Sequence, residues 1–206
     1  LMDAAYGRDA RLRAGMTELD VPYAVGIVPT ILMWAPGSGP RRMDKPMNNT
    51  GRRDEPELVS AKKVALGLPK QAWRTVTWRE GSADQLSSRF ARVRVRVGYN
   101  KLIPEKLSPE WLLIEWPKGE AEPTKYWLST LPENVSFTQL VDLAKLRWRI
   151  EETFRALKRG GLGLEDSQAE TAHRLFNVAA IALAAAVRII QLTDARDGSA
   201  RPASDV

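Results

Sequence analysis

A carboxylate with cations on either side stands in the segment LRWRIEETFRALKR, residues 146–159. At 100° per residue on a helical wheel, Arg147, Glu151 and Lys158 fall within about 40° of one another. An acid beside two cations on one helix face could hold a metal ion next to a phosphate backbone. The same spacing also fits ordinary surface ion pairs, which contribute about 0.2–0.5 kcal/mol each. Glu152 points about 100° further round, so we expect it to be a solvated partner of a surface cation.

The helix that positions Glu151 has clear start and stop signals. A capping box at Ser136 and Gln139 and two glycines after Arg159 predict one helix over about residues 137–159. Its apolar stripe runs beside the reactive face and contains Leu143, Leu146, Ile150, Phe154 and Leu157. We therefore expect Glu151 at the boundary of the core.

Composition indicates a globular protein with a polyanionic partner. The chain has 206 residues, of which 44% are hydrophobic and 27% charged, enough for one domain with a sizeable core or one domain carrying an insertion. The formal net charge of +6 and the sequence pI near 9.7 favour nucleic acid as the partner.

The absence of cysteine excludes disulfides, thiolate zinc sites and a cysteine nucleophile, and it fits a reducing cytosol. A single histidine, His173, excludes a multi-histidine metal site and is expected to have a structural or surface role. A catalytic metal would therefore be bound by oxygen, as Mg²⁺ or Mn²⁺ is.

No membrane association is expected from the sequence. The longest uncharged apolar run, residues 175–187, is shorter than the roughly 20 residues of a spanning helix and contains Asn177, so we expect a buried helix there. The N-terminal residues 1–13 lack the basic start and long apolar core of a signal peptide. We expect a cytoplasmic protein.

The N-terminal segment predicts a strand end, a helix and a strand in succession. Asp3 precedes a helical pattern in which Leu12, Met16 and Leu19 share a face, and the apolar segment 23–28 follows as a short buried strand. Only two residues precede Asp3, so the sequence is expected to begin within a fold whose first half is missing.

Residues 73–131 change to a period of two, which predicts a small antiparallel sheet inserted between helical units. The strand segments read RTVTWRE, RFARVRVRVGY, WLLIEWP and KYWLSTL. In the second of these, Arg92, Arg94 and Arg96 alternate with valines that should face the core. The arginines could track phosphates, and a solvated or ion-paired face explains the alternation equally well.

A second helix is predicted from a capping box at Ser167 and Glu170 to about Leu192, as a packing element. The apolar residues expected to pack are Leu175, Val178, Ile181, Leu183 and Ile189. The tail after residue 193 is expected to be disordered.

The order of an acid at a strand end, an inserted sheet and an acid on a later helix resembles the DDE transposases of bacterial insertion sequences. The resemblance rests on MDAAYG around Asp3, on the strands RTVTWREG, LLIEWP and KYWLSTLP, and on RWRIEETFRALK around Glu151. It covers nearly the whole chain up to the tail. It implies a ribonuclease-H-like domain that holds two divalent metal ions with Asp, Asp and Glu.

One branch of these enzymes carries a signature of tyrosine, arginine, glutamate and lysine. Arg147, Glu151 and Lys158 match it, whereas Ala144 stands at the place of the tyrosine. The first aspartate of the triad has no counterpart before Leu1. The resemblance therefore implies the C-terminal part of such a transposase.

Carried over by position, the resemblance makes Asp3 the second metal-binding aspartate and Glu151 the metal-binding glutamate, with Mg²⁺ or Mn²⁺ as cofactor. Arg147 and Lys158 would contact phosphates. Trp127 would stack on an unpaired base, although tryptophans in a half-buried sheet more often belong to the core.

The expected fold class is therefore α/β (α+β): a partial ribonuclease-H-like domain with an inserted antiparallel β subdomain and C-terminal helices. The predicted organisation is core residues 1–35, a loop 36–57, the β subdomain 58–132, core helices 133–193 and a disordered tail 194–206. The implied function is cleavage and strand transfer at transposon ends, with DNA as partner, a homodimer in the full-length form, and no activity of this chain alone. Two alternatives stay open: a non-catalytic module that binds DNA or dimerises, and a basic domain whose motif matches are accidental.

Overall fold

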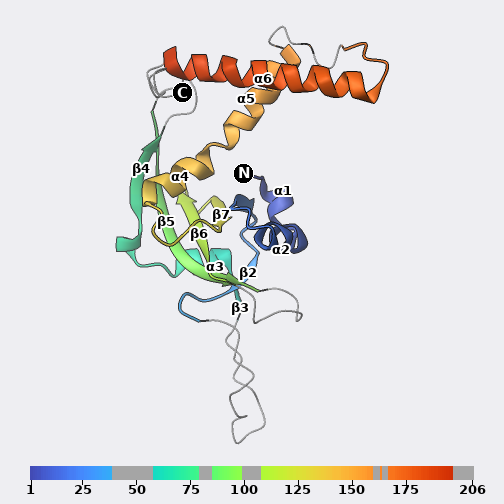
Figure 1. The fold of residues 1–206 in the computed structure, drawn as a ribbon. Coiled ribbons are helices and arrows are strands. Elements are labelled where there is room, and N and C mark those ends of the chain that lie inside the picture. The colour runs from blue at the N-terminus through green and yellow to red at the C-terminus, as the bar shows by residue number, and fades with distance from the viewer. Residues whose placement is uncertain (39–57, 79–84, 99–107, 160–162, 164–166, 197–206) are drawn as a thin grey trace, which may run out of the picture. The chain divides into compact units, whose positions relative to one another are not determined.

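The structure is a computed structural model that describes residues 1–38, 58–78, 85–98, 108–159, 163 and 167–196 (Figure 1). The chain divides into two compact units: Leu1–Trp78 with Gln85–Lys145, and Leu146–Val206 with Arg79–Asp84. The first unit is built on an antiparallel sheet and the described part of the second is helical, which confirms the predicted mixed α/β fold with C-terminal helices. Residues 39–57 of the predicted loop 36–57 and residues 197–206 of the predicted tail 194–206 lie outside the described residues.

The N-terminal segment folds as predicted. Two short helices, α1 (Ala4–Gly7) and α2 (Ala10–Glu18), lead to strand β1 (Ala24–Ile27). Met2, just before α1, forms an isolated parallel bridge with Val25 of β1, in agreement with the strand end expected there. Each helix begins at an aspartate whose carboxylate accepts backbone N–H groups that would otherwise lack partners.

The sheet has the strand order β1-β7-β6-β5-β2-β3, and β4 pairs with the other half of the long strand β5. All of these pairings are antiparallel. The strands after β1 are β2 (Leu32–Trp34), β3 (Leu58–Ser60), β4 (Arg74–Trp78), β5 (Leu86–Val97), β6 (Glu110–Trp116) and β7 (Lys125–Ser129). A helix α3 (Ala61–Leu66) and a single 3₁₀ turn η1 (Lys70–Ala72) join β3 to β4. The four predicted strand segments are confirmed as β4 to β7, and they share one sheet with β1 and β2.

Two apolar clusters lie on the opposite faces of this sheet. One contains Val95 and Val97 together with side chains of β1, β7 and α3, and Val93 packs against it, which confirms that the valines of β5 face the core. The other contains Phe90, Trp111 and Leu113 with the inner face of helix α4 (Phe137–Lys145). β6 is therefore buried on both faces.

The helix predicted over residues 137–159 is two helices in the structure. The capping box is confirmed, since Gln139 N–H donates to Ser136 Oγ at 3.1 Å and Ser136 N–H donates to Gln139 Oε1 at 3.1 Å. However, α4 ends at Lys145, and α5 (Arg147–Arg159) begins after a turn at Leu146. The predicted stripe is wrong in part, since Leu157 is buried in the second unit but Ile150 and Phe154 are exposed. The residues of α4 that pack on the sheet are Leu140, Val141 and Ala144.

The last helix, α6 (Ala172–Arg196), starts later than predicted and extends past the predicted end near Leu192. Thr171 Oγ1 accepts the N–H of Arg174 at 3.3 Å, whereas Ser167 is not helical. Figure 1 shows α6 crossing α5, and their small shared core contains Leu157, Ala182 and Ala186.

The expectation of a buried packing helix is wrong for α6. Its large apolar side chains are exposed, among them Phe176 at 77% and Ile181 at 73%, because alanines make the contact with α5. Leu175, Val178, Leu183 and Ile189 are exposed as well. Residues Ala172–Leu192 form a helix long and apolar enough to cross a membrane by length and composition, a property that core helices of soluble proteins share.

Candidate functional site

Asp3 is placed where a strand ends and a helix begins. Its Oδ1 accepts hydrogen bonds from the N–H groups of Ala5 at 2.9 Å and Tyr6 at 3.4 Å, so the carboxylate caps α1. The side chain is exposed, and its Oδ2 accepts no hydrogen bond from a described residue. One carboxylate oxygen of Asp3 is therefore available to a ligand.

Close packing fixes the position of the Asp3 helix on β1. A Cβ on Gly7 would lie 1.8 Å from the carbonyl oxygen of Gly26, so α1 can approach β1 only because this residue is glycine. Arg13, which is 2% exposed, donates a hydrogen bond to the carbonyl of Gly7 from α2. The glycine in the MDAAYG motif thus has a structural explanation.

Glu151 lies on α5 in an exposed ion pair. Its Oε1 accepts a hydrogen bond from Arg147 Nη1 at 2.6 Å, and the two side chains are 56% and 48% exposed. The expectation that Glu151 lies at the core boundary and Glu152 is solvated is wrong, since Glu151 is exposed and Glu152 half-buried. Different side chains of α5 are exposed than predicted, because α5 is a separate helix that begins after Leu146 and its buried side chain, Leu157, packs on α6.

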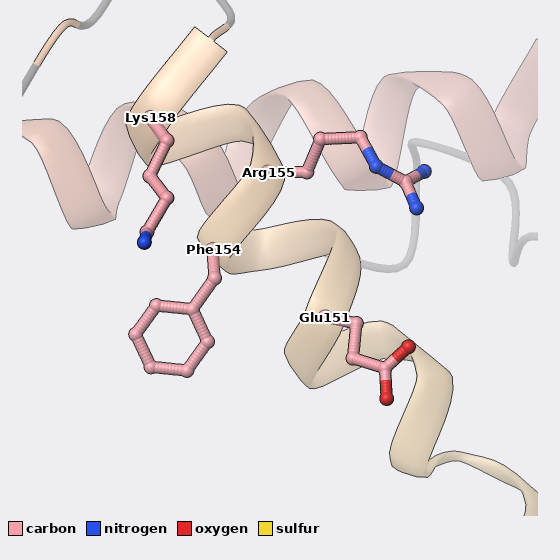
Figure 2. A pocket seen from close by; sticks show the side chains of 4 residues that line it. All are labelled: Glu151, Phe154, Arg155 and Lys158. Atoms are coloured by element: carbon pink, nitrogen blue, oxygen red, sulfur yellow. The ribbon is translucent and has the colours of Figure 1, made fainter.

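The reactive face of α5 borders an open hollow. Four residues line it, and Figure 2 shows Lys158 and Phe154 projecting from one side of the helix and Arg155 from the other, with Glu151 nearer its start. Glu151 and Lys158 thus both line the hollow together with Arg155, whereas Arg147, the third residue of the predicted face, is not among the lining residues.

The two predicted metal ligands are assigned to different compact units, Asp3 to the first and Glu151 to the second. Among the described residues, three or more Asp, Glu or His side chains do not gather in any one place. Each acid keeps an exposed carboxylate, which is a suitable ligand for a hard cation such as Mg²⁺.

Two of the three β5 arginines are held by contacts within the protein. Arg92 Nη1 donates to the carbonyl of Val135 at 2.6 Å, and its guanidinium lies 4.4 Å from the centroid of the Trp111 ring. Arg94 donates to the carbonyl of Pro109 and lies 3.6 Å from Glu133. Arg96 stands opposite Trp34 of β2. Burial lowers the pKa of both Arg92 and Arg94.

Trp127 belongs to the core and not to an exposed stacking surface. It is 8% exposed within the cluster under α4, and Lys145 Nζ lies 5.5 Å from its ring centroid. Because a base can stack only on an accessible ring face, the base-stacking role expected for Trp127 is not supported. The alternative interpretation, a tryptophan of the core, holds.

Arg74 is a candidate binding residue that the sequence interpretation did not single out. In the β4–β5 register it pairs with Phe90, which puts it on the same sheet face as Arg92. The period-two pattern of RTVTW shows which residues share a face of β4, but the sequence does not show which strand lies beside it.

The family model described as DDE superfamily endonuclease matches residues 1–85 of this chain. The matched part contains Asp3 with its helix and runs through β4. The first part of the chain is thus similar to DDE superfamily endonucleases, independently of the pattern around Glu151.

Proposed function

We propose that this chain is a part of a DDE-type transposase that acts on DNA. The observation that carries the proposal is the match of residues 1–85 to DDE superfamily endonucleases, with Asp3 at a strand end and an unshared carboxylate oxygen. The acid and cations of α5, which lie outside the matched residues, fit the same function. The order along the chain, with Asp3 first, then the sheet and then Glu151, agrees with this function as well.

In this proposal Asp3 and Glu151 bind the divalent metal ions, Mg²⁺ or Mn²⁺. Both side chains are exposed carboxylates, and the chain has neither cysteine nor a second histidine, so oxygen is the available donor. Metal ions held by these carboxylates would supply an activated water and stabilisation of the leaving oxygen when a phosphodiester is cut. The 3′-hydroxyl so produced would be the nucleophile in strand transfer.

The phosphate contacts near that reaction come from Arg147 and Lys158. Arg147 already lies 2.6 Å from Glu151, where it orients the carboxylate, and Lys158 shares the hollow with Arg155. Cations on an exposed helix face bind phosphate without reading sequence. The full-length enzyme is proposed to be a cytoplasmic homodimer acting at transposon ends and on target DNA.

The 206 residues are proposed to be inactive without further protein. The family binds its metals with three acids, and this chain matches two of them. The alternative is a non-catalytic module that binds DNA or dimerises; the basic net charge favours this reading as much as the catalytic one.

Metal-dependent DNA binding separates the two functions. We expect the protein to bind a labelled linear duplex in low salt, measured by fluorescence anisotropy, and to bind more tightly when Mn²⁺ is added. Asp3→Asn and Glu151→Gln should each abolish the gain from Mn²⁺ and leave binding in EDTA nearly unchanged. Asparagine retains the side-chain oxygen that caps α1, so folding should be preserved.

Two matched variants serve as controls. Asp9→Asn changes the corresponding cap of α2, where Oδ1 accepts from Arg11 N–H at 2.9 Å, and Glu170→Gln changes an exposed glutamate 4.0 Å from Arg174. Both should keep the gain from Mn²⁺. A gain that survives in Asp3→Asn and Glu151→Gln would favour the binding module, and no binding of DNA in low salt would reject both functions.

A further inference from the structure

Cations and aromatic rings alternate in a row on the sheet face that carries α4. The guanidinium carbons of Arg74 and Arg92 lie 5.5 Å and 5.6 Å from the centroid of the Phe137 ring. The guanidinium of Arg92 also lies over the Trp111 ring. Arg94, which pairs with Trp111 across the two strands, has its guanidinium carbon 5.0 Å from the centroid of the same ring. The row, which we call the arginine ladder, consists of Arg74, Phe137, Arg92, Trp111 and Arg94.

The charges along the ladder are unevenly compensated. Arg94 has Glu133 at 3.6 Å, and Glu133 and Glu110 oppose the lowering of its pKa by burial. The pKa of Arg92 is lowered by burial and then by the positive charge of Arg74. Among the described residues, the Arg74 side chain has no hydrogen bond or ion pair, and its contact is with the Phe137 ring. The end of the ladder at Arg74 and Arg92 is thus a pair of like charges that an anion would stabilise.

The two arginines differ in how firmly they are held. Arg92 is fixed by the Val135 carbonyl through Nη1 and by the Trp111 ring, while its other nitrogens have no hydrogen-bond partner among the described residues. The Arg74 side chain is exposed and lies over the Phe137 ring, its one side-chain interaction with the part of the chain that the structure describes. Because Arg92 is already held in place, its side chain loses little conformational entropy when it binds an anion. The planar guanidinium group matches the spacing of phosphate oxygens.

We propose that Arg74 and Arg92 together bind one phosphate of a DNA backbone beside Phe137. This inference rests on the proposed DNA-directed function and adds a phosphate contact made by residues of the first unit. Arg92 provides the fixed half of the site and Arg74 the half that closes on the phosphate. Because the contact is to phosphate, it carries no sequence information.

The test is the salt dependence of DNA binding by Arg74→Gln. One lost phosphate contact should reduce the slope of log K against log salt by about 0.9 and weaken binding severalfold at moderate salt. The loss should be equal for duplexes of unrelated sequence. Arg74→Lys, which keeps the charge, should restore most of the slope. Anisotropy titrations in EDTA across a range of salt concentrations measure all three effects.

Arg89→Gln is the matched control on the opposite sheet face. Arg89 is also an exposed arginine over an aromatic ring, 5.1 Å from the centroid of Trp116, and it pairs with Thr75, the residue after Arg74. Arg89→Gln removes one positive charge from the same pair of strands, and the slope of log K against log salt should stay at the wild-type value. Thermal melting checks that each variant is folded.

The outcomes separate this inference from the proposed function. A wild-type protein that binds DNA while Arg74→Gln and Arg89→Gln keep its slope would reject the phosphate site and leave the proposed function standing. A loss confined to one DNA sequence would reject a phosphate contact. A wild-type protein that binds no DNA would reject the proposed function itself, and this inference with it.

Discussion

Lys145 shows how a buried ammonium group is accommodated in this protein. Its Nζ lies 2.7 Å from Glu115 Oε2, and the two side chains are 7% and 4% exposed. The rings of Trp78, Phe90 and Trp127 lie 4.1 to 5.5 Å away, with their electron-rich faces available to the cation. A lysine in the last turn of a helix would be expected in solvent, yet here it fixes the end of α4 to the sheet.

Removal of the charge on Glu115 should therefore be costly. Glu115→Gln leaves the buried ammonium without its counter-charge, and we expect a loss of about 3–5 kcal/mol in the free energy of unfolding, measured by urea denaturation. The double variant Glu115→Leu with Lys145→Met should be more stable than Glu115→Gln, because it buries no charge.

The exposed pair of Lys62 and Glu122 provides the comparison, since its atoms are 2.5 Å apart and its side chains 40% and 55% exposed. Glu122→Gln should cost less than about 1 kcal/mol, because water screens the charges. Equal losses in the free energy of unfolding for Glu115→Gln and Glu122→Gln would show that burial does not make the Glu115–Lys145 pair more important for stability than an exposed pair.

At the scale of elements, the approach of α1 to β1 sets where Asp3 lies. The contact depends on Gly7, and the N–H of Gly7 donates to the Asp3 carbonyl at 3.0 Å. The backbone of β1, and not a flexible side chain, would meet any added Cβ. The position of the proposed metal ligand is therefore tied to a backbone contact between two elements.

Gly7→Ala should displace α1 and lower stability by about 1–3 kcal/mol, as overpacked contacts do. Gly15→Ala is the control within α2, because a Cβ there meets nothing within 4 Å, and it should raise stability by up to about 1 kcal/mol. Chemical denaturation of both variants gives the comparison. A Gly7→Ala protein as stable as wild type would show that α1 can move without cost.

At the scale of the whole molecule, the two compact units have very different cores. The first buries both faces of a sheet, whereas the shared core of α5 and α6 consists of Leu157, Ala182 and Ala186 with Ala156 packed against it. Local opening free energies follow the apolar surface that an element buries. The helical unit should therefore open well before the sheet.

Hydrogen exchange followed by mass spectrometry measures this difference directly. We expect the amides of β5, β6 and β7 to be the most strongly protected and those of α6 to exchange at least about tenfold faster, since about 1.4 kcal/mol corresponds to a factor of ten. The experiment uses the complete chain without substitutions. Equal protection of β6 and α6 would contradict the difference in stability between the two units.

Much of the fold could be predicted because its signals are local. The period of two in β4 to β7 and the capping box at Ser136 depend on residues within a few positions of each other, and both are confirmed. The break at Leu146 was missed because the residues on its two sides pack against different elements. The late start of α6 was missed because two hydroxyl residues, Ser167 and Thr171, offered a cap.

The sequence by itself determined which residues could do chemistry and the elements that carry them: Asp3 at a strand end, and Glu151 with Arg147 and Lys158 on a helix. Only the tertiary structure decided which side chains are accessible. It buried Trp127, joined Arg92 to Trp111, placed Arg74 beside Phe137, and left the apolar side chains of α6 exposed. The physical reason is that periodicity and caps act between near neighbours, whereas burial and cation–ring contacts join residues far apart in the chain, such as Arg74 and Phe137.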